Sequence, residues 1–294
     1  MARPQLDAIA KVAQQVSVLL AAGVAPASAW SYLDGVDDIA GVAQRGGNVA
    51  DALQRGGTSP TESSAWRGFG AAWRVATSAG APLAPTLERF ATSLRSLADA
   101  QREADVALAG PVATTRLVMA LPVVGVLFGM VLGFNTIGTL LTTGPGIACL
   151  VLGAALLLAG SRWNRRLVVA AEPKQLVPGL AFELMAIAVS GGGSLDRARA
   201  TVAETLETAG FPVSLDAVDR VLDLSRRAGV PAAALLRAEA EEERRDARAA
   251  AQRAAAVLAV KLMLPLGLCV LPAFMVLAVV PMVLAVISST VASF

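Results

Sequence analysis

The fold is decided by residues 117–161, LVMALPVVGVLFGMVLGFNTIGTLLTTGPGIACLVLGAALLLAGS, which contain no Asp, Glu, Lys or Arg over 45 residues. Residues 262–294 repeat this pattern for 33 more. Placing one Arg or Lys at the centre of a bilayer costs roughly 2.5–3.5 kcal/mol, so uncharged stretches of this length indicate segments selected for hydrocarbon. The sequence therefore predicts a membrane protein whose charged residues lie in two blocks, 1–116 and 162–261.

The lengths of the uncharged stretches set the number of crossings. A helix rises about 1.5 Å per residue and a hydrocarbon core is about 30 Å thick, so the first stretch is long enough for two spans and the second for one. The turn is expected at Phe134-Asn135-Thr136, and Pro145 begins the return span. We expect a cytoplasmic helical domain at 1–116, a transmembrane hairpin at 117–161, a second cytoplasmic helical domain at 162–260, a third transmembrane helix at 261–288 and a short extracytoplasmic tail at 289–294.

The cations predict the orientation of these spans. Arg116 precedes the first span, Arg162 to Arg166 follow the second, and Arg248 to Lys261 lead into the third, whereas the hairpin loop and the tail carry none. Cytoplasmic flanks of membrane helices are enriched in Lys and Arg. Both polar domains and the N-terminus of this multi-pass protein are therefore expected in the cytoplasm and the C-terminus outside it.

Composition excludes several classes of chemistry. The chain has no histidine, which excludes imidazole-based triads and metal or haem sites with histidine ligands. A net charge of +2 does not indicate nucleic-acid binding. The sequence shows no pairing of a nucleophile with a base, so we predict no catalytic residue, no metal site and no cofactor.

The polar blocks have helical periodicity throughout, which predicts an all-α protein in which each block forms a small helical bundle. Ser59-Pro60-Thr61-Glu62 is typical of a helix start, and Ser194 and Ser214 are also expected to cap helices. Trp66, Phe69 and Trp73 follow at helical spacing and are expected in a core.

The chain also repeats itself. Gly80-Ala81-Pro82 recurs as Gly229-Val230-Pro231 at an offset of 149, and Leu121-Pro122 recurs as Leu271-Pro272 at an offset of 150. The segment ending at Gly23 resembles the segment ending at Gly191, at an offset of 168. The expected architecture is therefore two related cytoplasmic helical bundles joined to three transmembrane helices. The predicted helix-turn positions are Gly23, Gly80, Gly191, Gly229 and Pro231.

These signatures resemble those of a known family. The helix, glycine turn and helix unit at residues 20–26 and 191–195 resembles the repeat of the type II secretion system F family, and residues 261–274, KLMLPLGLCVLPAF, resemble the last span of its Tad-type (Flp pilus) members. The resemblance implies a non-enzymatic inner-membrane platform of a pilus or secretion machine. It implies partners as well: a hexameric assembly ATPase, pilin subunits, a second related platform protein, membrane lipid, and further copies in a homo- or hetero-oligomer. A transporter or permease subunit is the alternative.

Two further sets of residues have competing interpretations. Gly125, Gly129 and Gly133 lie at four-residue spacing in the first span, where small residues let helices approach closely; the alternative is chance in a glycine-rich chain. The charge run at residues 239–248 is explained by a solvated helix with weak ion pairs. Docking of a partner through Glu241, Arg244 and Arg245 is the alternative.

Overall fold

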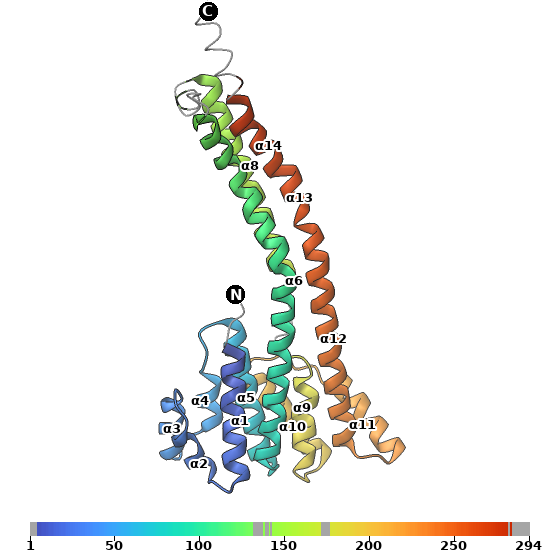
Figure 1. The fold of residues 1–294 in the computed structure, drawn as a ribbon. Coiled ribbons are helices and arrows are strands. Elements are labelled where there is room, and N and C mark those ends of the chain that lie inside the picture. The colour runs from blue at the N-terminus through green and yellow to red at the C-terminus, as the bar shows by residue number, and fades with distance from the viewer. Residues whose placement is uncertain are drawn as a thin grey trace, which may run out of the picture. The chain divides into compact units, whose positions relative to one another are not determined.

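The computed structural model describes residues 5–131, 138, 141, 143–171, 177–281 and 283, which form helices joined by turns and loops and include no strand. The all-α prediction is confirmed for these residues. The chain divides into two compact units. Figure 1 colours the helices by residue number, from blue at the N-terminus to red at the C-terminus. Unit 1 contains Met1–Arg102 and Pro173–Ala250, and unit 2 contains Glu103–Glu172 and Ala251–Phe294.

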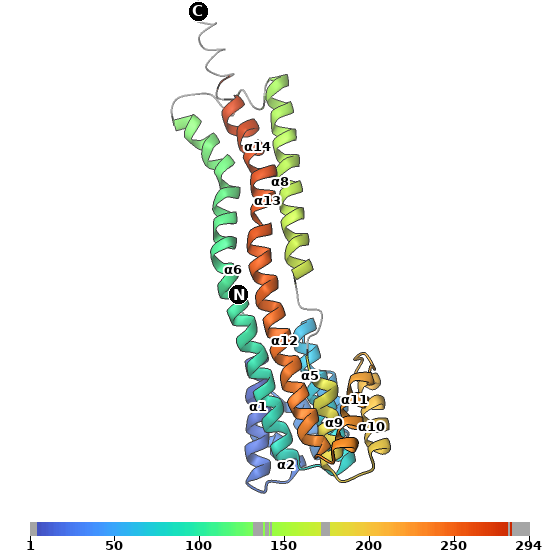
Figure 2. The ribbon, with the colours of Figure 1, turned by 90° about the vertical axis from the view of Figure 1, so that its right-hand side faces the viewer.

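Unit 1 combines helices from both polar blocks of the sequence. The first block supplies α1 (Gln5–Ala21), α2 (Pro26–Ala29), the 3-10 turn η1 (Trp30–Tyr32), α3 (Asp37–Gln44), α4 (Val49–Gln54), α5 (Pro60–Ala79) and the start of α6 (Leu83–Val131). The second block supplies α9 (Leu180–Ser190), α10 (Leu195–Thr208), α11 (Asp216–Ala228) and most of α12 (Ala232–Lys261). Helices α5, α9 and α10 pack against one another, as the two views in Figures 1 and 2 show.

The predicted start of α5 is confirmed. The Ser59 hydroxyl accepts the backbone N–H of Glu62 at 3.2 Å, and Pro60 is the first helical residue. The Glu62 carboxylate in turn accepts the backbone N–H of Thr58 at 2.9 Å. This hydrogen bond to Thr58 is the main reason that the pKa of Glu62 lies below its ordinary value.

The two predicted serine caps in the second block have different outcomes. Ser194 caps α10 by accepting the N–H of Arg197 at 3.3 Å. The prediction that Ser214 caps α11 is wrong, because the N-cap residue is Leu215 and its side chain makes no capping hydrogen bond. Leu215 is buried in the core. The gain from burying this leucine, rather than a hydroxyl cap, therefore fixes where α11 begins.

Aromatic side chains form the centre of the core in unit 1. The ring of Trp30 lies 5.3 Å from that of Trp73 and 5.9 Å from that of Phe69, and Phe69 lies 5.5 Å from Phe90. Trp30, Phe69, Trp73 and Phe90 are buried and Trp66 is half-buried. The core assignment of Phe69 and Trp73 is therefore confirmed, and Trp66 lies at the edge of that core.

Helix α9 is buried along most of its length. Glycines at both of its ends allow close backbone contact with neighbouring helices. A Cβ on Gly179 would lie 2.6 Å from the Ala240 carbonyl oxygen of α12, and a Cβ on Gly191 would lie 1.9 Å from the Ala79 carbonyl oxygen of α5. Such separations exclude any side chain at either glycine without movement of the backbone, so α9 is held closely between α5 and α12.

The prediction of two helical bundles is not confirmed. One continuous buried cluster contains side chains from both polar blocks, from Leu6 of α1 to Ala240 of α12. Arg67 of α5 also joins the blocks, because its guanidinium donates to the Ala209 carbonyl oxygen at 3.3 Å and lies 5.4 Å from the centre of the Phe211 ring. The two blocks share one core in unit 1.

Unit 2 holds the apolar helices. It contains the end of α6, α8 (Gly144–Ala171), the end of α12, and the following segments α13 (Met263–Pro265), η2 (Leu266–Val270), α14 (Leu271–Phe274) and η3 (Met275–Val279). Among the described residues, two helices are long and apolar enough to cross a membrane, Gly144–Ala170 and Ala232–Val279. Three spans were expected, and the predicted turn at Phe134-Asn135-Thr136 lies outside the described residues.

The last helix contains two π-helical turns, η2 directly before α14, which includes Pro272, and η3 directly after it. The N–H of Leu271 donates to the carbonyl oxygen of Leu266, and the N–H of Val280 donates to that of Met275. Proline removes one backbone donor and its ring crowds the preceding turn. Pro272 has no N–H to donate to the Leu268 carbonyl oxygen, and the π-helical turn η2 ends directly before the helical turn that contains this proline.

The structure supports the sequence repeat. Gly80 and Gly229 end α5 and α11 in the same left-handed conformation, with φ values of 70° and 68°. In unit 2 the side chain of Gln252 on α12 donates to Glu103 on α6 at 2.9 Å, and these two residues are 149 positions apart. The repeat offset is therefore also the register in which α6 and α12 meet.

Candidate functional site

The most unusual side chain in unit 1 is Glu183, the only charged residue of α9. Its carboxylate is 6% exposed. Burying an unpaired carboxylate is strongly unfavourable, so such a group requires partners from neighbouring elements. Its position on the central helix places these partners on the helices that surround α9.

Arginines from two helices supply those partners. Arg89 of α6 places its Nε 3.6 Å from Oε1 of Glu183, and Arg244 of α12 places its Nη1 3.7 Å from Oε2. Arg244 also pairs with Glu241 at 3.1 Å. Both contacts to Glu183 are longer than hydrogen bonds, so they act through charge more than through shared protons. We call Glu183, Arg89, Arg237 and Arg244 the α9 charge cluster.

Arg237 of α12 completes this cluster. Its guanidinium donates to the Ser190 hydroxyl at the end of α9 at 2.7 Å. Burial lowers the pKa of Arg237, the neighbouring charge of Arg89 lowers it further, and the charge of Glu183 opposes both effects. The arginines of the cluster therefore outnumber its one carboxylate, and Glu183 limits the repulsion between α6 and α12.

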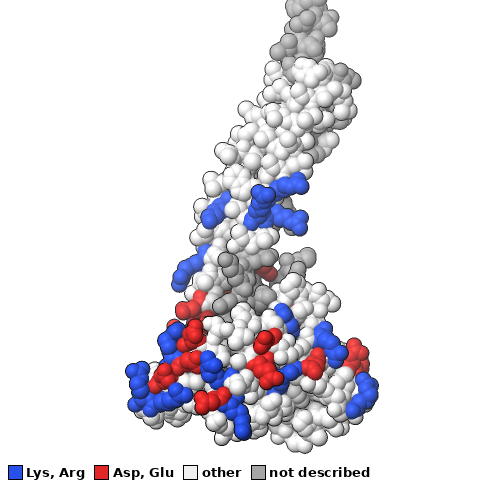
Figure 3. All heavy atoms as spheres, turned by 180° about the vertical axis from the view of Figure 1, so that it is seen from behind, with Lys and Arg blue, Asp and Glu red and all other residues white. Residues whose placement is uncertain are grey.

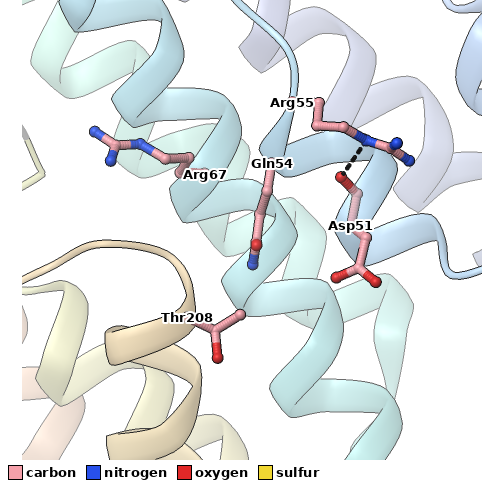
Figure 4. A pocket seen from close by; sticks show the side chains of 5 residues that line it. All are labelled: Asp51, Gln54, Arg55, Arg67 and Thr208. Atoms are coloured by element: carbon pink, nitrogen blue, oxygen red, sulfur yellow. Dashed lines mark hydrogen bonds between the residues drawn. The ribbon is translucent and has the colours of Figure 1, made fainter.

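A second candidate is an open hollow of about 450 Å³ between α4, α5 and α10. Figure 4 shows its lining side chains, which are Asp51, Gln54, Arg55, Arg67 and Thr208. Arg55 Nε donates to the Asp51 carbonyl oxygen at 3.2 Å, and the Asp51 carboxylate pairs with Arg74. The hollow therefore carries both signs of charge, and its acidic member already has a partner.

The predicted helix-turn residues lie at helix ends. Gly23 follows α1 with φ of 88°, and Pro231 directly precedes α12. Gly191 ends α9 with φ of −77°, so it is required there by the close approach of Ala79 rather than by its backbone angle. The structure distributes these residues over several helix junctions and does not bring them together as one site.

The predicted glycine ladder faces the last helix at one of its positions. A Cβ on Gly125 would lie 2.8 Å from the Cβ of Ala278 and 2.9 Å from the ring of Phe274. Gly125 is half-buried and Gly129 is buried. Gly133 lies outside the described residues. Gly125 therefore lets two helices of the same chain pack closely. A contact of this glycine with a second copy of the chain stays a prediction.

The three residues proposed for partner docking differ in exposure. The side chains of Glu241 and Arg245 are 49% and 67% exposed and pair with each other at 3.7 Å. The side chain of Arg244 is 16% exposed and belongs to the α9 charge cluster. Glu241 and Arg245 lie on the surface that a partner could reach, whereas Arg244 lies between Glu241 and the buried Glu183 and pairs with both.

The sequence analysis missed Glu183, Arg89 and Arg237. The signal for Glu183 was present, because it is the single charge within the apolar run LAFELMAIAVS at residues 180–190. A lone carboxylate in such a run requires a buried cation. No local pattern indicates which arginine meets it, because Arg89 is 94 positions away along the chain.

Comparison with known families gives one match. Residues 12–132 match the model of the family Type II secretion system (T2SS), protein F, a segment that runs from α1 through α6. No curated protein and no solved structure matches the chain. The match supports the family resemblance noted in the sequence for that segment, and it carries no information on the Tad or Flp type.

Proposed function

We propose that this chain is a non-enzymatic platform protein of a bacterial secretion or pilus-assembly machine in the inner membrane. The match of residues 12–132 to protein F of the type II secretion system carries the proposal. Proteins of this family are non-catalytic platforms in the inner membrane. The two helices long and apolar enough to cross a membrane agree with that location.

The helices α6 and α12 provide a route by which such a platform could act. Each contributes residues to unit 1 and to unit 2. Within unit 1 both approach Glu183, and within unit 2 the contact Glu103–Gln252 joins α6 to α12. Gly125 of α6 also packs against Phe274 of α14, which continues the same long helix as α12. A rotation imposed on unit 1 would reach the apolar helices through these two connections, and no chemistry in this chain is required.

The finer part of the proposal concerns the partners. A hexameric assembly ATPase drives unit 1 from the cytoplasm, the apolar helices receive pilin subunits, and a second related platform protein completes the assembly. The resemblance of residues 261–274 to the last span of Tad-type members favours a Tad/Flp-type pilus. The cations at the polar ends of the apolar helices favour a cytoplasmic location for unit 1.

Co-purification tests this proposal. The full-length chain is solubilised from membranes in a mild detergent, captured through a tag, and its partners are identified by mass spectrometry. A hexameric ATPase and pilin subunits are expected, and the tag must remain inaccessible to an impermeant label in intact cells when it is fused to unit 1. Labelling of unit 1 from outside, or substrate flux in liposomes containing this chain alone, would contradict the platform assignment.

A further inference from the structure

The charges of unit 2 are distributed very unevenly. Residues 106–171 and 251–294 contain six cations and no Asp or Glu. Five of these cations have described side chains, and all five are exposed: Arg162, Arg165 and Arg166 on α8, and Arg253 and Lys261 on α12. We call these five residues the basic collar.

The helix register places four members of the collar at one level. A Cβ on Gly153 would lie 2.3 Å from Leu277, and a Cβ on Gly160 would lie 3.1 Å from the Cβ of Cys269 and 4.0 Å from the Pro265 carbonyl oxygen. These contacts show that α8 runs antiparallel to the last helix. If this register continues for one turn beyond Gly160, Arg162, Arg165 and Arg166 of α8 lie level with Lys261 of α12. Arg253 lies eight residues before Lys261, which is about 12 Å along α12 at about 1.5 Å per residue.

The collar lies at a border on the surface of unit 2 between an uncharged side and a mixed side, on which exposed valines such as Val168, Val169 and Val257 lie among the cations. On one side the exposed side chains are apolar, including Val151, Leu152 and Leu158 of α8 and Met263 and Leu264 of the last helix. Trp163, 37% exposed, lies at the border itself. Figure 3 shows the broad white surface ending at a group of blue side chains. Tryptophan and cations beside an apolar surface are typical of the zone of lipid headgroups.

The collar cations have no partners within the described part of the chain, since none of them forms an ion pair there. Arginines of unit 1 behave differently, as in Arg199 with Asp219 at 2.9 Å. Arg162, Arg165 and Arg166 are spaced three and four residues apart and so project from one face of α8. Three guanidinium groups on one face can each donate two parallel hydrogen bonds to phosphate oxygens.

We infer that the basic collar binds the phosphate groups of anionic phospholipids and selects them over zwitterionic lipids. The complementarity is in charge, because an anionic headgroup brings no cation of its own to oppose the collar. Binding at Arg162, Arg165 and Arg166 holds α8 at a fixed depth, and its packing on the last helix extends that hold to α14 and η3. The inference rests on the membrane location in the proposed function and requires neither the ATPase nor pilin.

The test uses the full-length protein purified in a neutral detergent. Its thermal unfolding midpoint is measured with added phosphatidylglycerol, with phosphatidylcholine, and with glycerol phosphate at the same concentration. Phosphatidylglycerol should raise the midpoint by several degrees more than the other two. Equal shifts with both lipids would overturn the inference, and a full shift with glycerol phosphate would overturn the assignment to lipid.

Variants assign the effect to the collar. R162Q/R165Q/R166Q should lose more than half of the preference for phosphatidylglycerol, while R220Q/R226Q/R227Q, the same loss of charge on α11, should keep it. R162K/R165K/R166K keeps the charge and should retain most of the preference, which protects the test against misfolding of the glutamine variant. Equal losses in the collar and α11 variants would overturn the inference.

Extraction of membranes with alkaline carbonate separates this inference from the proposed function. If carbonate releases the wild-type chain, the membrane location itself is contradicted. If the chain stays in the membrane but shows no lipid preference, only the collar inference is contradicted.

Discussion

Arg95 and Arg244 are 149 residues apart, the offset of the repeat, and each joins the long helix of its own half to an earlier helix of that half. In the first half Arg95 of α6 donates to the Gln14 side-chain oxygen of α1 at 3.2 Å, on the surface. In the second half Arg244 of α12 lies 3.7 Å from Glu183 of α9. The same position thus serves a neutral surface contact in one half and a buried charge pair in the other.

The difference follows from where α1 and α9 lie. Helix α1 is at the periphery of unit 1, with Val18 57% exposed, whereas α9 is enclosed by α5, α10 and α12. A surface contact competes with water and contributes little to stability. A buried carboxylate has no such alternative, so its pairing becomes necessary. The two halves related by the sequence repeat are therefore not equivalent, and we expect the second half to be more sensitive to substitution.

The largest expected effect is that of Glu183→Gln. The change leaves Arg89, Arg237 and Arg244 without their carboxylate. Removing one member of a buried pair costs about 3–5 kcal/mol. Because the Arg89 side chain is 36% exposed and can reach water, we expect a loss of about 3 kcal/mol in the free energy of unfolding, at the lower end of that range. Urea unfolding of the purified chain, followed by tryptophan fluorescence, measures it.

Gln14→Ala in the first half is the matched control for this prediction. It should cost at most about 0.5 kcal/mol, as is usual for surface contacts. Equal losses for the two variants would remove the contrast between the halves.

Gly191 and Gly23 provide the second comparison, because they are equivalent at the offset of 168. Gly191→Ala places a Cβ 1.9 Å from the Ala79 carbonyl oxygen. The backbone must move, and we expect a loss of about 2–3 kcal/mol, as in overpacked cores. A Cβ on Gly23 would have no atom within 4 Å. Only the backbone φ of +88° opposes Gly23→Ala, and holding alanine in that conformation costs about 1–2 kcal/mol. A larger loss at Gly23 in the same urea assay would contradict the central position of α9.

The sequence predicted local features better than long-range ones. The Ser59 and Ser194 caps and the helix ends at Gly80 and Gly229 depend on neighbouring residues, and the structure confirms them. The merging of the two polar blocks depends on contacts such as that of Arg67 with Ala209, 142 positions apart. Periodicity indicates which face of a helix is buried and does not indicate against what it is buried.

The same limit applies to the candidate site. Glu241 and Arg245 were singled out for docking because dense charge is visible in a sequence, and Arg244 was grouped with them. Only the fold shows that Arg244 turns toward Glu183. The Ser214 cap failed for a related reason, because burial of Leu215 outweighs a local hydrogen-bond preference.

Unit 2 allows a third comparison, between a glycine packed against a neighbouring helix and one with open space beside it. Gly153→Ala brings a Cβ to 2.3 Å from Leu277 Cγ, a side chain that can move. We expect a loss of about 1–2 kcal/mol, because the helices must separate slightly. Gly267 has nothing within 4 Å, so Gly267→Ala should be neutral or stabilising, by up to about 1 kcal/mol from helix propensity. Thermal aggregation in detergent reports both changes, and equal midpoints would contradict the packing of α8 on the last helix.

The smallest expected effect comes from the ion pair that joins α10 to α11 in the second half. Arg199 donates to both carboxylate oxygens of Asp219 at 2.9 Å, and these hydrogen bonds hold the pKa of Asp219 below its ordinary value. A lowered pKa in the folded state stabilises the fold above the unfolded value of about 3.9. The stabilisation disappears as the pH falls through the folded pKa.

Asp219→Asn tests this smallest effect. The variant should be slightly less stable than the wild type at pH 7, and the difference should shrink as the pH falls below about 3.9 and vanish below the folded pKa of Asp219. Asp34→Asn, on an exposed turn, is the control and should be as stable as the wild type at pH 7. In the first half the pair Asp51–Arg74 joins α4 to α5 and is less exposed at its arginine, 23% against 49% for Arg199. The carboxylates have the opposite order, 49% exposed for Asp51 and 37% for Asp219. The two substitutions should therefore cost similar amounts at pH 7, and a clearly larger loss for Asp219→Asn would show that the second half is the more sensitive even at its surface.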